Sequence, residues 1–214
     1  SSRSHYMNGN ATIMAANKLM DAMRKPDGTY RTYAEMVAEG IPTRYEAKFD
    51  NADRGDLCDI SPNTGVGDPM PEHAYCLFLA EVEVEVATGK TTVIGLTLVD
   101  DVGKIGNIHV LDGQAYGGMS HSVGFALSEN YEDVRKHDNP AGAGIPTIKT
   151  IPDKFNVIHM SNPRRDGPFG SCGASEAYQS SGHMAVINAI HNATGVRIYE
   201  LPATPEKVKA GIDT

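Results

Sequence analysis

The sequence of 214 residues has no tryptophan, only three cysteines and no long apolar run. Cys58, Cys76 and Cys172 are odd in number and far apart, which is typical of free thiols in a reducing compartment and excludes a complete disulfide framework. We therefore expect a cytoplasmic location. No apolar stretch approaches the roughly 18 residues of a membrane-spanning helix, so no membrane segment is predicted.

Basic residues are also scarce, because 19 lysines and arginines stand against 27 aspartates and glutamates, a formal charge of -8. Arg164 and Arg165 form the only pair of adjacent arginines. Such a surface repels phosphate backbones on average, so no nucleic-acid partner is expected. Hydrophobic residues make up 40% of the chain, and a globule of this length buries roughly 70% of its unfolded surface. The composition predicts a globular fold with a core.

The amino-terminal stretch SSRSHYMNGN has neither an initiator methionine nor the basic and apolar regions of a signal peptide. We expect residues 1–214 to be one piece of a longer polypeptide or a processed subunit. Any activity would then depend on parts that this chain does not supply.

Hydrophobic periodicity predicts the elements of the first half. Apolar residues recur every three or four positions over 10–25, which predicts a helix. Residues 40–75 carry prolines and glycines without a sustained period, which predicts a long loop excursion. Valines alternate with glutamates in LFLAEVEVEVATGKTTVIGLTLVDD, which predicts an antiparallel hairpin. We interpret its three glutamates as the solvated face of a strand and not as a metal site.

The second half predicts helices that alternate with short strands. The strands are KFNVIHM and VRIYEL, and a helix over 181–194 ends at Gly195. A last helix has Thr204 as its N-cap and Pro205 at its first position. The order of elements predicts an α+β fold in which helices pack on the antiparallel hairpin.

A glycine-rich helix is predicted over 111–127, where apolar residues keep a helical spacing. Its glycines each weaken a helix by up to about 1 kcal/mol relative to alanine. Two explanations stay open. The glycines either allow close packing against another helix, or they let a bulky ligand approach the backbone, with Gln114 offering amide donors and an acceptor.

Glu176 lies between the glycine-rich stretch GPFGSCGAS and the start of a segment that is predicted to be helical. It could complement a helix dipole, which is worth about 0.3 to 1 kcal/mol. It could also act as a general base, provided that partial burial raises its pKa towards working pH. A third interpretation is a structural hydrogen bond to the amides of its own loop.

Other nucleophile and metal motifs are weaker. Cys172 could be a nucleophile with His183 or His191 as its base, but no spacing shows that these residues are close, and free cysteines are more often small buried side chains. His183 and His191 are too far apart along a helix for a zinc pair. HAYC, at 73–76, has no second matching pair, so no metal ligands are predicted.

Three segments in order, SSRS, DGQAYGGMSHSVGFALSE and DGPFGSCGASEA, resemble the carboxy-terminal quarter of the molybdenum-binding region of the xanthine oxidase family. The resemblance covers nearly the whole chain. Within that family, GVRIYELPATPEKVKAGI and EVEVEVATGK are most similar to the aldehyde oxidoreductases of sulfate-reducing bacteria. The resemblance therefore implies the molybdopterin-binding domain of an aldehyde-oxidising molybdenum hydroxylase.

The resemblance implies roles for individual residues. Glu176 matches the family's general base, which takes a proton from the hydroxide or water on molybdenum. That oxygen attacks the carbonyl carbon while hydride passes to the sulfido ligand, and the product is a carboxylic acid. Gln114 matches the glutamine that hydrogen-bonds the pterin. A loop around the pterin and its phosphate would be formed by Ser1, Ser2, Arg3, Ser4 and His5. The pterin dithiolene holds the metal, so no side chain need be a ligand.

This chain departs from the family pattern at the residues around Glu176. Ser175 stands where the family commonly has glycine, and AYQ follows where a proline is common, which puts substrate specificity in doubt. We expect Ser175 to be a cofactor-binding residue, because its hydroxyl would reach the metal ligands or the carboxylate of Glu176.

The resemblance also implies partners and cofactors. The cofactor would be molybdopterin cytosine dinucleotide with molybdenum. The [2Fe-2S] clusters that carry electrons away would lie outside this chain, which has no Cys-X-X-Cys motif. The complete enzyme is expected to be a homodimer. Two alternatives remain: a hydroxylase of purines or other N-heterocycles, and a non-catalytic cofactor-binding or assembly subunit.

Overall fold

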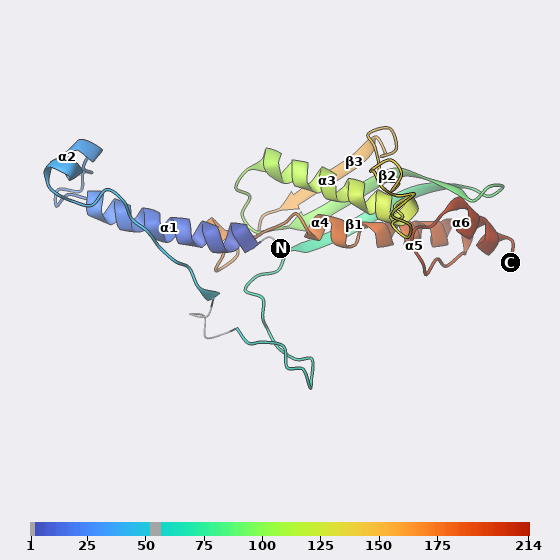
Figure 1. Cartoon of the computed structure of the whole chain (residues 1–214), viewed down its shortest axis with the longest axis horizontal. Helices are drawn as coiled ribbons and strands as arrows, with labels where there is room; N and C mark the ends of the chain where they lie inside the picture. The colour runs from blue at the N-terminus through green and yellow to red at the C-terminus, as the bar shows by residue number, and fades with distance from the viewer. Residues whose placement is uncertain (1–2, 52–56) are drawn as a thin grey trace. The chain divides into compact units, whose positions relative to one another are not determined.

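The computed structural model describes residues 3–51 and 57–214, which divide into two compact units (Figure 1). Unit 1 combines residues 1–73 with 163–173, and unit 2 combines residues 74–162 with 174–214. The predicted region 1–214 is therefore built from two interleaved parts.

Unit 2 is built on a mixed three-stranded sheet in the order β1-β2-β3. β1 (Tyr75–Glu85) and β2 (Lys90–Asp101) are antiparallel, which confirms the predicted hairpin. β3 (Lys154–Met160) pairs with β2 in parallel, and its bounds are those of the predicted KFNVIHM strand. The chain returns through helix α3 (Ile108–Leu127), because parallel strands need a crossover connection.

The two faces of the sheet differ. Leu96 and Leu98 of β2 are buried on the face that the helices of unit 2 cover. On β1, the three glutamates predicted to be solvated, Glu81, Glu83 and Glu85, are exposed. Exposed apolar side chains precede these glutamates on the same face of β1. This face of the strand is therefore apolar at one end and acidic at the other.

Three further helices complete unit 2: α4 (Ala177–Ser180), α5 (Gly182–Thr194) and α6 (Pro205–Ile212). The predicted end of α5 and the predicted start of α6 are confirmed. Gly195 ends α5 in the left-handed region at φ 77°, where glycine carries no steric penalty. The Thr204 side chain accepts a hydrogen bond from the backbone N–H of Lys207 and so caps α6.

The predicted final strand VRIYEL is wrong. Residues 196–199 have no regular secondary structure, and Tyr199 is 93% exposed. β-branched and aromatic residues favour a strand only where a neighbouring strand can pair with it. This segment instead leads to Ala203, whose backbone N–H donates to the carbonyl of Ala126 in α3.

Unit 1 is made of helices and irregular chain in its described part. α1 (Arg3–Met23) begins earlier than the helix predicted over 10–25, and the 3-10 turn η2 (Pro168–Gly170) packs against it. α2 (Tyr33–Ala38) was not predicted. The described part of 40–75 is mostly irregular as expected, with an isolated bridge between Cys58 and Asp68.

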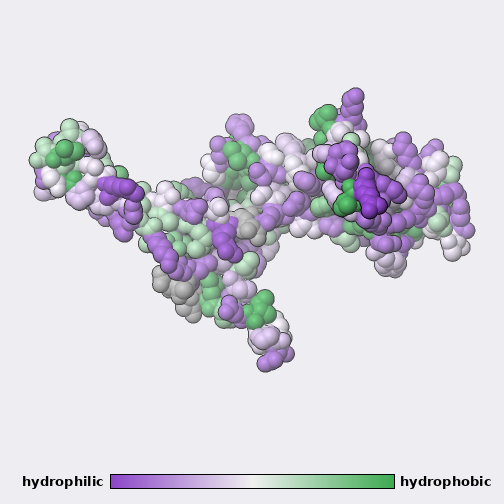
Figure 2. Space-filling model, in the orientation of Figure 1, coloured by the Kyte–Doolittle hydropathy of each residue, from purple (hydrophilic) through white to green (hydrophobic). Residues whose placement is uncertain are grey.

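Unit 1 buries few apolar side chains. Among its described residues, the buried apolar side chains are Tyr6, Met36, Pro168 and Cys172. Apolar side chains gather instead on the surface over α2, where Tyr33 and Val37 are exposed (Figure 2). No helix in the described ranges combines the length and the apolar character needed to cross a membrane.

Candidate active site

Helix α3 carries Gln114 on its exposed face. The opposite face is fully buried at Ala115, Met119 and Ala126. The helix begins at Ile108, earlier than the helix predicted over 111–127, and is capped by Asn107, so Gln114 lies beyond its first turn. A Cβ added at Gly113 or at Gly117 would meet nothing within 4 Å. The backbone around the Gln114 amide is therefore open to a ligand.

The other glycines of α3 have a packing role. A Cβ at Gly118 would lie 2.5 Å from the Cβ of Tyr178, and a Cβ at Gly124 would lie 2.2 Å from the Oε1 of Glu129. The close-packing explanation therefore holds at two positions, and the ligand explanation stays a prediction at the other two. Gly118 and Gly124 allow close packing, whereas Gly113 and Gly117 leave free backbone.

Glu176 is the N-cap residue of the short helix α4, and its side chain makes no capping bond to that helix. It is exposed, and Ser175 before it is partly buried. α4 packs against α3 through Tyr178 and Gly118. The structure thus brings the segment of Glu176 against the helix of Gln114. The partial burial that a general base requires is not provided by the described residues of this chain.

The amino-terminal segment is helical at the residues that can be described. Ser1 and Ser2 lie outside the described residues. Arg3, Ser4 and His5 form the first turn of α1, so the expected loop is wrong for them. A helix N-terminus still suits a phosphate, because its unpaired backbone N–H groups point along the axis.

His5 connects the first and third segments of the resemblance within unit 1. Its Nε2 lies 2.7 Å from the Oγ of Ser171. That hydroxyl donates its proton to the carbonyl of Pro168, so it accepts from His5, whose Nε2 carries the hydrogen. Asn10 also donates to the carbonyl of Asp166. Two segments far apart in the sequence are therefore held side by side.

A buried polar cluster was missed by the sequence reasoning. Nδ1 of His159 lies 2.7 Å from Oδ2 of Asp100, and its Nε2 lies 3.0 Å from Oδ1 of Asp112. Burial raises the pKa of Asp100, although the charge of His159 and hydrogen bonds from Tyr178 and His159 oppose the rise. No sequence motif signals this cluster, because the parallel pairing of β2 with β3 creates it.

The alternative nucleophile and metal sites gain no support. Cys172 is buried and forms no disulfide, which agrees with its interpretation as a small buried side chain. His183 and His191 both lie on α5. Within the described ranges, no group of three His, Cys, Asp or Glu side chains could hold a metal ion.

The fold and the two packed segments define a cofactor-binding domain. Residues 1–152 match the family of the molybdopterin cofactor-binding domain, and the chain belongs to that family. The resemblance to the molybdenum-binding region of the xanthine oxidase family is thereby confirmed.

Aldehyde oxidoreductases are among the known proteins that are most similar to this chain. The chain is 48% identical over 207 residues to an aldehyde oxidoreductase of Megalodesulfovibrio gigas, covering 97% of this chain and 22% of that protein. The structure of an aldehyde oxidoreductase from Desulfovibrio gigas matches all of this chain with a TM-score of 0.95 and 46% identity, over 23% of its own length. That of Desulfovibrio desulfuricans matches 98% of this chain with a TM-score of 0.91 and 48% identity, again over 23% of its length.

The chain thus spans less than a quarter of the length of these relatives. The predicted α+β class is confirmed by the structural matches.

Proposed function

We propose that this chain supplies part of the cofactor site and the general base of a molybdenum-dependent aldehyde oxidoreductase. The observation that carries the proposal is the packing of the Glu176 segment on the helix of Gln114, in a chain of the molybdopterin-binding family. The substrate class follows from the relatives, which are aldehyde oxidoreductases. The proposed reaction converts an aldehyde and water to a carboxylic acid, two protons and two electrons.

The residues present fit a pterin cofactor. Gln114 offers donors and an acceptor on a helix face where the adjacent glycine backbone has no side chain around it. Arg3, Ser4 and the N-terminus of α1 would hold the phosphate end. When bound, the molybdenum and its pterin accept the electron pair that leaves the substrate. A dinucleotide form with cytosine is proposed from the sequence resemblance.

Glu176 is proposed to remove the proton from the water-derived nucleophile. Its carboxylate needs a less solvated environment to become a good base near neutral pH. Because Glu176 is exposed in this chain, the cofactor, the substrate and other parts of the enzyme would have to exclude water around it. Ser175 is proposed to orient the substrate or the carboxylate through its hydroxyl.

We propose that the rest of a larger enzyme covers this chain. Unit 1 buries few of its own apolar side chains, and Tyr75, Leu77 and Leu79 of β1 are each more than half exposed. Exposed apolar patches mark interaction surfaces. The [2Fe-2S] clusters and the dimer contacts are assigned to those other parts. The free cysteines favour a reducing compartment, for which we propose the cytoplasm.

The test is a Glu176→Gln variant of the complete enzyme, assayed with benzaldehyde and a dye as electron acceptor. Loss of a general base should lower kcat per bound molybdenum by about 100-fold or more. Molybdenum content should stay near that of the wild type, because glutamine keeps the size of the side chain. Glu83→Gln is the matched control, because Glu83 lies exposed on β1.

Two results would contradict the proposal. If Glu176→Gln retains turnover per molybdenum, the carboxylate is not the base. If the purified complete enzyme contains neither molybdenum nor a pterin that fluoresces after oxidation, the chain is an assembly or binding subunit.

A further inference from the structure

Strand β2 carries a carboxylate on its row of core residues. Leu96, Leu98 and Asp100 alternate along the strand and face the same side of the sheet. The Asp100 side chain is 0% exposed. An ionised carboxylate loses several kcal/mol of solvation when it is buried without partners. The burial of the Asp100 carboxylate therefore requires polar groups around it.

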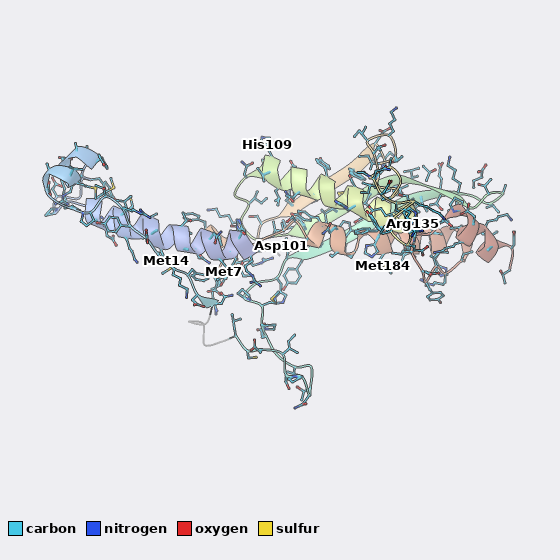
Figure 3. The ribbon with its side chains drawn as sticks, viewed as in Figure 1. Met7, Met14, Asp101, His109, Arg135 and Met184 are labelled. Carbon is cyan, nitrogen blue, oxygen red and sulfur yellow. The ribbon has the colours of Figure 1, made fainter. Side chains whose placement is uncertain are left out.

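β3 supplies the first partner. The parallel register places His159 directly opposite Asp100, and the imidazole binds Asp100 through Nδ1. Its other nitrogen, Nε2, reaches across to Asp112 on α3. One buried ring therefore bridges the sheet and the crossover helix. His109, labelled in Figure 3, marks the first turn of α3, and Asp112 follows in the next.

Both bonds of the imidazole can be satisfied at once. If Asp100 is ionised, both ring nitrogens donate and the ring is an imidazolium. If Asp100 is protonated, its hydroxyl donates to Nδ1, while Nε2–H still donates to Asp112. The two forms hold the same number of protons. The bridge from β2 to α3 therefore persists in either form.

Tyr178 extends the bridge to α4. Its side chain is fully buried, and it is one of the groups that lower the pKa of the Asp100 carboxyl against the effect of burial. This interaction is electrostatic and differs from the two hydrogen bonds of His159, because Oδ1 of Asp100 has no hydrogen-bond partner among the described residues. Asp101, labelled in Figure 3, is the last residue of β2 and lies outside this cluster. Its carboxylate accepts a hydrogen bond from the side-chain amide of Asn162.

The two ends of this bridge adjoin the proposed functional residues. Asp112 lies two positions before Gln114, and Tyr178 lies two positions after Glu176. We propose that Asp112, His159, Asp100 and Tyr178 form a positioning bridge that fixes the Glu176 segment against the Gln114 helix. The inference rests on the proposed function, because it assigns the bridge a role only through those two residues.

Stability alone does not account for such a cluster. Replacing a buried ion pair by apolar residues of similar volume is often neutral or stabilising. Gly118 already packs the backbone of α3 against Tyr178, so the two helices would touch without the polar groups. The hydrogen bonds of His159 add direction to this contact, because they fix which atoms of β2, β3 and α3 lie opposite one another, and the electrostatic interaction of Tyr178 with Asp100 adds α4.

The test uses the complete enzyme with Asp112→Ala, Asp112→Asn and Tyr178→Phe. Alanine at 112 suits a partly buried helical position and removes the carboxylate, whereas asparagine keeps an acceptor for Nε2–H. We expect Asp112→Ala and Tyr178→Phe each to lower kcat per bound molybdenum by about 10- to 100-fold, as for other groups that orient ligands. KM for benzaldehyde should change little, and Asp112→Asn should recover most of kcat.

The double variant Asp112→Ala with Tyr178→Phe tests whether the two ends act through one bridge. Its loss of kcat should be clearly smaller than the product of the single losses. The inference is overturned if both single variants keep kcat per molybdenum within twofold of the wild type, or if their losses multiply. Glu176→Gln is measured beside them. If it is inactive while the bridge variants are fully active, the bridge inference fails and the proposed base stands, whereas an active Glu176→Gln rejects both.

Discussion

Adjacent glycines of α3 differ in what an added methyl group would meet. At Gly118 the new carbon would lie 2.7 Å from the carbonyl carbon of Tyr178, whereas at Gly117 it would meet nothing within 4 Å. Alanine favours a helix over glycine by about 1 kcal/mol, and overpacking costs about 1 to 3 kcal/mol. The clash should therefore dominate at Gly118, and helix propensity should dominate at Gly117.

We accordingly expect Gly118→Ala to lower the thermal unfolding temperature of the 214-residue chain and Gly117→Ala to leave it unchanged or raise it. In the complete enzyme, Gly117→Ala should instead reduce the bound pterin, because its methyl group would stand where the cofactor approaches the backbone. Calorimetry and pterin fluorescence measure the two effects. Equal thermal shifts for both variants, or full pterin content in Gly117→Ala, would contradict the assignment.

At the scale of single elements, α2 shows how a short helix is held on the surface. Thr32 accepts from the N–H of Glu35, and the Glu35 side chain accepts from the N–H of Thr32, which is a capping box. Lys25 adds a hydrogen-bonded ion pair at 2.7 Å to Glu35. The threonine and glutamate three positions apart were a readable helix signal that the sequence reasoning overlooked.

This cap has a definite pH dependence. The Lys25 ammonium, together with the amide and hydroxyl of Thr32, lowers the pKa of Glu35 from 4.5 to about 2. A carboxylate with a lowered pKa stabilises the fold above its unfolded pKa and loses this effect as pH falls through the folded value. The cap should be complete above pH 4.5 and should fail towards pH 2.

An NMR titration of the Glu35 carboxyl carbon in the complete enzyme, where the other parts are expected to stabilise unit 1, measures this pKa. Lys25→Met should raise it towards the ordinary glutamate value. Lys48→Met is the control, because that ammonium pairs with Asp50. A wild-type midpoint near 4.5 would show that the ion pair and the cap do not form in solution.

Elements were predicted best where their signal is local. The alternation of valine and glutamate, the cap at Thr204 and the stop at Gly195 each act within a few residues, and each was confirmed. VRIYEL failed because a strand also needs a partner edge, which no local pattern reports. The site follows the same rule. Glu176 and Gln114 stand out in glycine-rich local sequence and received their roles from the resemblance, whereas the contact of His159 with Asp100 depends on residues 59 positions apart.

At the scale of the whole chain, the two units differ in how far they stabilise themselves. Unit 2 buries a sheet face under helices, including Leu98, Met119 and Val186. In unit 1, α1 has 21 residues but a single buried one, Tyr6. Isolated helices are marginal in water, and most helical stability in proteins comes from packing. Unit 1 should therefore depend on surfaces that this chain does not supply.

Hydrogen exchange can test this dependence directly. In the isolated chain, amides of α1 and α2 should exchange rapidly, whereas those of β2 between its two partner strands should be protected. In the complete enzyme, α1 and α2 should gain protection, because the other parts would cover exposed residues such as Met14 on α1 (Figure 3) and Val37 on α2. β2 is the internal control and should change little. Equal protection of α1 in both preparations would show that unit 1 is stable without the rest of the enzyme, and the proposed coverage of its apolar surface would then be wrong.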